Sequence, residues 1–271
     1  MPELAEVEYY RKIWDAGVGA RVQCVLLHAS VRIFRGVDTA ELIRGIEGSK
    51  LLSSEAQAKQ MLFRFGRGRK PTAWLGVHLG MSGELRVERK DFTPQKHDHL
   101  VLVQRDRALV FADARTFGRV RFHVGAKAPS WWSDLPAAVT SDEFTVDRMR
   151  GFLARRRRTP VKAFLLMQEF FPGVGNWMAD EILWRARISP KVHVGRLTGN
   201  QSRTLWREAR EVCRIALETV GAGDPDPPKG WLFHVRWSSK GVCPRCQSRL
   251  KTATIGGRTT RWCPTCQSAR S

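Results

Sequence analysis

Four cysteines near the C-terminal end constrain the folding of this chain more than any other feature. They form two CxxC pairs with the spacing Cys243-x2-Cys246-x16-Cys263-x2-Cys266. Each pair places two thiolates on one tight turn, and four thiolates suit the tetrahedral coordination of zinc. Because no coordination position is left for water, we expect one structural zinc ion rather than a catalytic one. The alternative, a redox-active pair of dithiols, lacks a thioredoxin-like sequence around it.

The chain is strongly basic. Its 271 residues include 46 Lys and Arg against 26 Asp and Glu, which gives a formal net charge of +20. With 42% hydrophobic residues the chain can still build a core, and this combination is typical of folded proteins that bind nucleic acid. A GC-rich genome would explain arginine in place of lysine, but it would not explain the excess of basic over acidic residues.

Nothing in the sequence predicts a membrane-bound or secreted protein. No run approaches the roughly 20 apolar residues of a membrane span, and an acidic start with Glu3, Glu6 and Glu8 is unlike a signal peptide. The remaining cysteines, Cys24 and Cys213, fit small apolar residues better than a disulfide framework. We therefore expect a monomer in the reducing cytoplasm.

Hydrophobic periodicity divides the chain into parts of different character. Residues 1–14 have the three-to-four spacing of a helix, and residues 19–125 alternate in short runs punctuated by glycine, as in a β-sandwich. From 145 to 220 the apolar spacing is helical. We predict an α+β protein with an N-terminal β-sandwich domain over residues 1–130, a linker over 131–144, a helical domain over 145–226 and a zinc finger over 227–271.

The first residues carry a candidate nucleophile. Removal of Met1 would leave Pro2 with a free secondary amine beside the carboxylate of Glu3. An α-amino group has a pKa near 7.7–8.0, so part of it is unprotonated at neutral pH and can form a Schiff base. Taken alone, the proline is better explained as the start of the first strand or helix.

Three glycine-bounded loops carry further candidates. Residues 171–177 (FPGVGNW) lie between two helical stretches, and they form either a phosphate-binding helix N-terminus or a plain corner in which Asn176 caps the next helix. Residues 78–83 (HLGMSG) and 113–118 (DARTFG) expose Met81 and Phe117, with Arg115 beside the latter. Apolar side chains of this kind can wedge into unstacked DNA, although a methionine in a sheet is more commonly part of the core.

These pieces together resemble the formamidopyrimidine-DNA glycosylase/endonuclease VIII family of base-excision repair enzymes. The matching segments follow the family's order along almost the whole chain: residues 2–4 and 6–8, Ala58-Lys59, residues 78–83, Lys96-His97-Asp98-His99, residues 113–118, residues 173–176 and 179–181, and the four cysteines. The resemblance implies the β-sandwich, a helix–two-turn–helix DNA-binding domain and a zinc finger. It is closer to the formamidopyrimidine-DNA glycosylase branch, through Leu4 and the HLGMSG loop.

The resemblance also implies roles for individual residues. Pro2 would attack C1′ of the damaged nucleotide, Glu3 would relay protons, Glu6 would support the site and Lys59 would contact phosphate or the lesion. The remaining matches would contact DNA: Asn176 and Arg258 would hold phosphates, Met81, Arg115 and Phe117 would fill the gap left by the extruded nucleotide, and His97 would belong to the same interface.

Two departures from the family pattern leave open which lesion such an enzyme would remove. Ala5 replaces the usual proline, and residues 221–242 are shorter than the stretch that closes over 8-oxoguanine in the family. We expect a bifunctional glycosylase/AP lyase acting on oxidised purines in double-stranded DNA of a bacterial cell. The alternatives are the same chemistry on oxidised pyrimidines or abasic sites, and a DNA-binding protein without catalysis.

Overall fold

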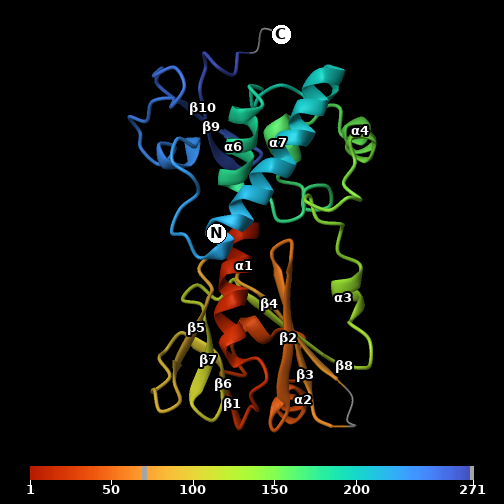
Figure 1. Cartoon of the computed structure of the whole chain (residues 1–271), viewed down its shortest axis with the longest axis vertical. Coiled ribbons are helices and arrows are strands. Elements are labelled where there is room, and N and C mark those ends of the chain that lie inside the picture. Colours follow the sequence, from red (N-terminus) through yellow and green to blue (C-terminus); the bar gives the residue numbers. More distant parts are fainter. Residues whose placement is uncertain (69–71, 269–271) are drawn as a thin grey trace. The chain divides into compact units, whose positions relative to one another are not determined.

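The computed structural model describes residues 1–68 and 72–268 (Figure 1). The chain forms two compact units, one made of Met1–Pro2 and Glu6–Leu135 and the other of Glu3–Ala5 and Pro136–Ser271. The first unit contains eight strands and the second most of the helices, so the predicted α+β class is confirmed. The three residues Glu3–Ala5 belong to the C-terminal unit although the rest of α1 (Leu4–Ile13) belongs to the N-terminal one.

The N-terminal unit is a β-sandwich, as predicted. One antiparallel sheet has the order β1 (Cys24–Leu27), β6 (Asp98–Val103), β7 (Arg107–Ala112) and β5 (Glu84–Arg89). The other has the order β2 (Lys50–Gln57), β3 (Gln60–Gly66), β4 (Ala73–His78) and β8 (Arg119–Val124). Alternating apolar residues from both sheets share one core, in which Phe63, Phe65 and Phe111 are fully buried.

Short helices complete this unit. The 3-10 helix η1 (Trp14–Gly17) continues α1 and buries Trp14 completely, while η2 is Arg32–Phe34 and α3 is Ser130–Ser133. In α2 (Thr39–Ile46) the side chain of Asp38 accepts a hydrogen bond from the Glu41 amide, so Asp38 is the N-cap of this helix.

The C-terminal unit is helical, as the spacing of its apolar residues predicts. It contains α4 (Val146–Arg155), α5 (Val161–Leu165), α6 (Asn176–Arg185) and α7 (Gly199–Glu218), with the 3-10 helices η3 (Val194–Arg196), η4 (Val220–Ala222) and η5 (Leu232–His234). Leu205, Ala209, Val212, Cys213 and Ala216 form the buried stripe of α7, which begins with a Thr198/Gln201 capping box.

A two-stranded hairpin, β9 (Lys251–Ile255) and β10 (Arg258–Trp262), follows between the two cysteine pairs. Its turn uses Gly256 and Gly257, both with positive φ. In the described part of the chain we find no helix with the length and apolarity needed to cross a bilayer.

Candidate active site and nucleic-acid interface

The carboxylate of Glu3 is fixed at the N-terminus of α6. Only 2% of Glu3 is exposed, and its two oxygens accept hydrogen bonds from the amides of Trp177 (2.9 Å) and Met178 (3.1 Å). The Leu4 amide donates to the carbonyl of Gly173 (3.0 Å), so the backbone after Glu3 is also held by the loop that precedes α6. Amides at a helix N-terminus stabilise a negative charge, which explains how a carboxylate can be buried here.

Gly175 makes this approach possible. A Cβ atom at this position would overlap the carboxyl carbon of Glu3. Gly175 is therefore required for space and not for an unusual backbone angle, since its φ is −121°.

Asn176 does not cap α6, and this part of the sequence-based prediction is wrong. The N-cap residue is Gly175, without a side-chain cap, and the Asn176 amide group instead donates from Nδ2 to the carbonyl of Thr259 in β10 (2.9 Å). The alternative interpretation, a phosphate on the helix N-terminus, is limited by a different contact. Two of the amides that such a phosphate would use already bind the Glu3 carboxylate.

A buried ion cluster that the sequence analysis missed joins α5, α6 and the hairpin. Asp180 accepts from Lys162 Nζ (2.6 Å), from Arg236 Nη2 (2.7 Å) and from the Arg261 amide (3.1 Å). All three side chains, Asp180, Lys162 and Arg236, are almost fully buried. Burial lowers the pKa of Lys162, and the charges of Asp180 and Glu3 oppose that shift.

The cluster keeps β10 beside α6. Lys162 also donates to the Asn176 carbonyl (2.7 Å), so the same lysine ties α5 to the first residue of α6. One feature of the sequence could have indicated this ion cluster: Lys162 stands in the otherwise apolar run 161–165 (VKAFL). A lysine buried in such a run needs an acidic partner. The partner itself is distant in sequence.

The other predicted catalytic residues, Pro2, Glu6 and Lys59, belong to the N-terminal unit. Pro2 precedes Glu3 directly, Glu6 lies in the first turn of α1, and Lys59 lies at the tip of the β2–β3 hairpin. Lys59 is close enough to His78 at the end of β4 to lower the pKa of its imidazole, although burial of His78 has the larger effect.

Asp113 organises the two loops that carry the candidate wedge residues. Its carboxylate, 1% exposed, accepts from Ser82 Oγ (2.7 Å) in one loop and from the Gly118 amide (2.7 Å) in the other. Met81 and Phe117 are 37% and 42% exposed. Met81 lies in the turn between β4 and β5, so the alternative of a methionine in the core of a sheet is wrong. The Arg115 guanidinium lies 4.8 Å from the centre of the Phe117 ring.

The two histidines of the Lys96–His99 segment differ in exposure. His97 is exposed on the turn before β6, and its carbonyl accepts from the Asp113 amide (3.0 Å). His99 is buried, with Nε2 at 3.0 Å from the Asp113 carbonyl. The backbone of the segment thus supports the 113–118 loop, and of the two imidazoles that of His97 is available at the surface.

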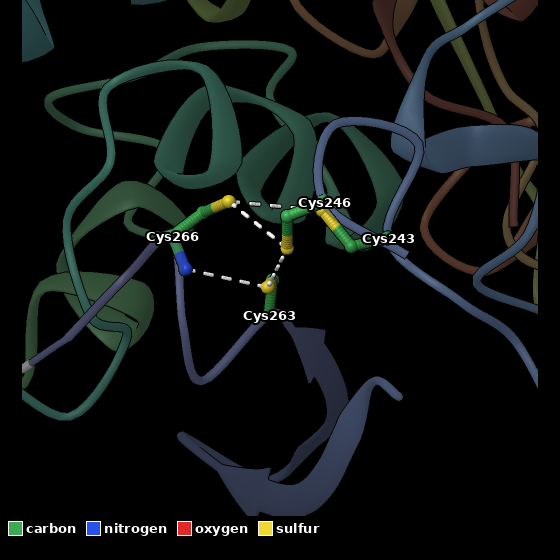
Figure 2. Close-up of side chains that lie close together, drawn as sticks. All are labelled: Cys243, Cys246, Cys263 and Cys266. Carbon is green, nitrogen blue, oxygen red and sulfur yellow. Dashed lines mark hydrogen bonds between the residues drawn. The ribbon is translucent and has the colours of Figure 1, made fainter. Parts of the chain in front are cut away.

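The four cysteines come together as one cluster (Figure 2). Their Sγ atoms all lie within 4.8 Å of one another, with Cys246 at 3.5 Å from Cys263 and Cys243 at 3.9 Å from Cys266. Tetrahedral zinc–thiolate bonds of about 2.3 Å require sulfur atoms about 3.8 Å apart. The donor set and its spacing therefore fit zinc, and the four cysteines are the one group among residues 1–68 and 72–268 that could hold a metal ion. Arg258, the first residue of β10, is exposed beside the turn of the hairpin.

Glu181, next to Asp180 in α6, binds the segment that follows α7. It is fully buried, and one oxygen accepts from the Phe233 amide (3.2 Å) while the other has no hydrogen-bond partner among the described residues. Burial raises the pKa of Glu181 to about 8, against the opposing effect of the backbone amides of Phe233 and Leu232.

This buried carboxyl group predicts a pH-dependent stability. Because the folded state keeps a proton that the unfolded state loses above its pKa of 4.5, stability should fall as the pH rises from about 4.5 to about 8. The slope would be at most about 1.4 kcal/mol per pH unit. The thermal stability of Glu181→Gln should depend less steeply on pH than that of the unchanged chain. Glu169→Gln, at an exposed glutamate paired with Arg156, is the control; the same slope in all three proteins would contradict the prediction.

Comparisons with known proteins identify the family of this chain. The family model of the formamidopyrimidine-DNA glycosylase N-terminal domain matches residues 1–120, and that of the H2TH domain of the same enzyme matches residues 135–225. The chain belongs to the formamidopyrimidine-DNA glycosylase family. The resemblance inferred from the sequence is therefore confirmed.

Relatives in this family match the chain over nearly its whole length. The formamidopyrimidine-DNA glycosylase of Xanthomonas axonopodis pv. citri is 34% identical and covers 98% of this chain and 100% of its own. That of Psychromonas ingrahamii is 31% identical and covers 99% of this chain and 100% of its own.

Solved structures in the family share the fold. A structure of MutM in complex with DNA containing carbocyclic 8-oxo-G is 25% identical, with a TM-score of 0.87, and covers 98% of this chain and 100% of its own. The Lactococcus lactis Fpg in complex with DNA containing an abasic site is 24% identical, with a TM-score of 0.87 and coverage of 98% and 99%.

Proposed function

We propose that this chain is a bifunctional DNA glycosylase and AP lyase of base-excision repair. The amine of Pro2 attacks C1′ of the damaged nucleotide, the bond from C1′ to the base breaks, and the base leaves with a proton. A proton delivered to the ring oxygen O4′ then breaks the C1′–O4′ bond, and the product is an iminium between Pro2 and the opened sugar. Loss of a proton from C2′ then breaks the C3′–O bond, and a second elimination breaks the C5′–O bond.

The position of Glu3 is the observation that carries this proposal. Its carboxylate is buried, adjacent in the chain to the attacking amine, and fixed by two amides of α6. A carboxyl group with so little freedom is suited to accepting a proton, passing it to the sugar ring oxygen O4′ and relaying the protons of the eliminations. Glu6 and Lys59 are proposed to assist, Glu6 by supporting the amine and Lys59 by contacting a phosphate or the lesion.

Double-stranded DNA with a damaged base or an abasic site is the proposed substrate. Asn176 and Arg258 would hold phosphates, the wedge residues Met81, Arg115 and Phe117 would fill the vacated stack, and His97 would contact the same duplex. Cys243, Cys246, Cys263 and Cys266 would hold one zinc ion, which would stabilise the hairpin that carries Arg258. The bacterial origin of the relatives fits a role in the cytoplasm.

Oxidised purines are the preferred lesions in this proposal, with formamidopyrimidine first and 8-oxoguanine second. Similar chains have been solved with DNA containing carbocyclic 8-oxo-G and with DNA containing an oxidized pyrimidine, so both classes must be compared. Excision from duplexes carrying formamidopyrimidine, 8-oxoguanine or dihydrouracil separates the purine from the pyrimidine alternative.

Borohydride trapping tests the reaction itself. On a duplex with one abasic site we expect a covalent adduct, mapped by mass spectrometry to Pro2 in a chain that lacks Met1. Pro2→Gly and a chain with an N-terminal extension should both bind the duplex, while the extended chain yields no adduct. Trapping on a lysine, or undiminished cleavage by the extended chain, would refute Pro2 as the nucleophile. Binding without any adduct would favour a non-catalytic DNA-binding protein.

A further inference from the structure

A positively charged pocket lies on the outer face of the β2–β3–β4–β8 sheet, within the N-terminal unit. Strand register places Gln60, His78 and Arg119 in one row across β3, β4 and β8, and Leu62, Gly76 and Arg121 in the next row. A cavity of about 240 Å³ opens over these two rows, with Arg35 and Phe117 also in its wall.

The pocket has cationic walls without acidic partners. Arg35, Arg119 and Arg121 form no ion pair with any carboxylate in the described residues, and no acidic residue lines the cavity. The Nε of Arg119 is buried and lacks a hydrogen-bond partner among the described residues. Burial lowers the pKa of Arg121, and the charges of Arg119 and Arg35 lower it further. Like charges held together in this way cost free energy unless an anion joins them.

The remaining polar groups of the pocket are also suited to an anion. His78 Nδ1 accepts a hydrogen bond from the Gly80 amide (3.0 Å), so a neutral imidazole carries its proton on Nε2. Burial and the nearby cations lower the pKa of His78, which favours that neutral form at pH 7. The pocket can therefore offer an imidazole N–H, an amide and guanidinium groups to one ligand, and all of these can donate.

We propose that Arg119 and Arg121, with Arg35, form a subsite for a backbone phosphate of DNA. This inference rests on the proposed function, because it takes the polyanion to be the duplex on which the enzyme acts. A phosphodiester has oxygens for several donors and fits the charge of the pocket. Phe117, a proposed wedge residue, lines the same cavity, so the phosphate would lie close to the nucleotides that the wedge separates.

The salt dependence of DNA binding tests this subsite. Arg119→Gln removes a guanidinium that makes no hydrogen bond or ion pair among the described contacts, while Arg121 also stacks on Trp131 at 5.4 Å. Arg119→Gln is therefore the principal variant, and Arg121→Gln is accompanied by a thermal unfolding measurement. Arg64→Gln is the matched control, because Arg64 is an exposed arginine in the next row of the same sheet face, opposite Trp74.

We expect Arg119→Gln to weaken binding to all duplexes alike. The plot of log association constant against log salt concentration should become less steep by about 1, the value for one lost phosphate contact. If both guanidiniums hold one phosphate, the double variant should lose no more slope than Arg119→Gln alone. A slope equal to that of Arg64→Gln and of the unchanged chain would overturn the proposal.

Two further measurements separate the outcomes. Borohydride trapping at saturating duplex should still occur with Arg119→Gln, so a lost subsite is distinguishable from a failed lyase reaction. If the unchanged chain gives no trapped adduct, the proposed function is refuted but the phosphate subsite is not. The NMR signal of the Arg119 Nε–H group should shift with undamaged duplex. A shift with inorganic phosphate or a mononucleotide but not with duplex would overturn the assignment to DNA.

Discussion

Gly175→Ala is expected to reduce strand cleavage at an abasic site at least about 100-fold, the order of loss that follows a displacement of about 1 Å in a catalytic group. The new Cβ would occupy the space of the Glu3 carboxyl carbon, so the carboxylate must leave the amides of Trp177 and Met178. Single-turnover cleavage of a duplex with one abasic site measures the effect. DNA affinity, measured by titration, should change much less.

Two further variants distinguish displacement of Glu3 from general misfolding. Gly151→Ala lies in α4 with open space around the new Cβ, and it should leave cleavage unchanged while stabilising the helix by about 0.5–1 kcal/mol. Glu3→Ala combined with Gly175→Ala removes the overlap, so thermal stability should recover while cleavage stays low. Full cleavage by Gly175→Ala would show that the fixed carboxylate is not needed.

Loss of zinc is expected to have the second large effect. In small zinc modules the metal supplies about 10–16 kcal/mol of apparent folding free energy. The buried apolar cluster at this site has only five residues: Trp184 of α6, Leu232, Leu250 and the two cysteines Cys243 and Cys263. Cys263→Ser or a strong chelator should therefore unfold the hairpin and release Arg258. Affinity for a lesion-containing duplex should fall by two orders of magnitude or more, as several phosphate contacts are lost together.

Cys24, a cysteine outside the cluster, provides the control for this experiment. Cys24→Ala, at a half-buried strand position, should leave both the zinc content and the affinity unchanged. The far-ultraviolet circular dichroism of the β-sandwich should persist after chelation, because its core is made of residues from the N-terminal unit. Unaltered DNA binding by a zinc-free chain would contradict the role proposed for Arg258.

The features that were predictable from the sequence are those that depend on nearby residues. Alternating apolar residues in the strands, the stripe of α7 and the cap at Asp38 each reflect spacing of a few residues, and the structure has all three. The CxxC pairs are predictable for the same reason, since each pair forms its own turn and zinc requires four such ligands.

Contacts between distant residues explain where the prediction was incomplete. Asn176 was expected to cap α6, but its amide binds Thr259, more than eighty residues away, and its place at the helix end is taken by the Glu3 carboxylate. No structural role was predicted for Asp180 from the sequence, because its partners Lys162, Arg236 and Arg261 belong to three separate segments. Buried charges must be paired, but sequence spacing does not identify the partner when the two residues are far apart in the sequence.

The sequence by itself determined the α+β class, the cysteine ligands, the basic character and, through its resemblance to a family, the residues to examine. The tertiary structure decided which donors and acceptors meet: Glu3 with the start of α6, and Asp113 with two loops. It also placed three arginines around one cavity whose wall, in the described part of the chain, contains no acidic residue. The physical reason is that local conformation and metal-ligand spacing are properties of short segments. Burial, charge compensation and pocket shape instead depend on strand register and on the packing of elements that the sequence keeps far apart.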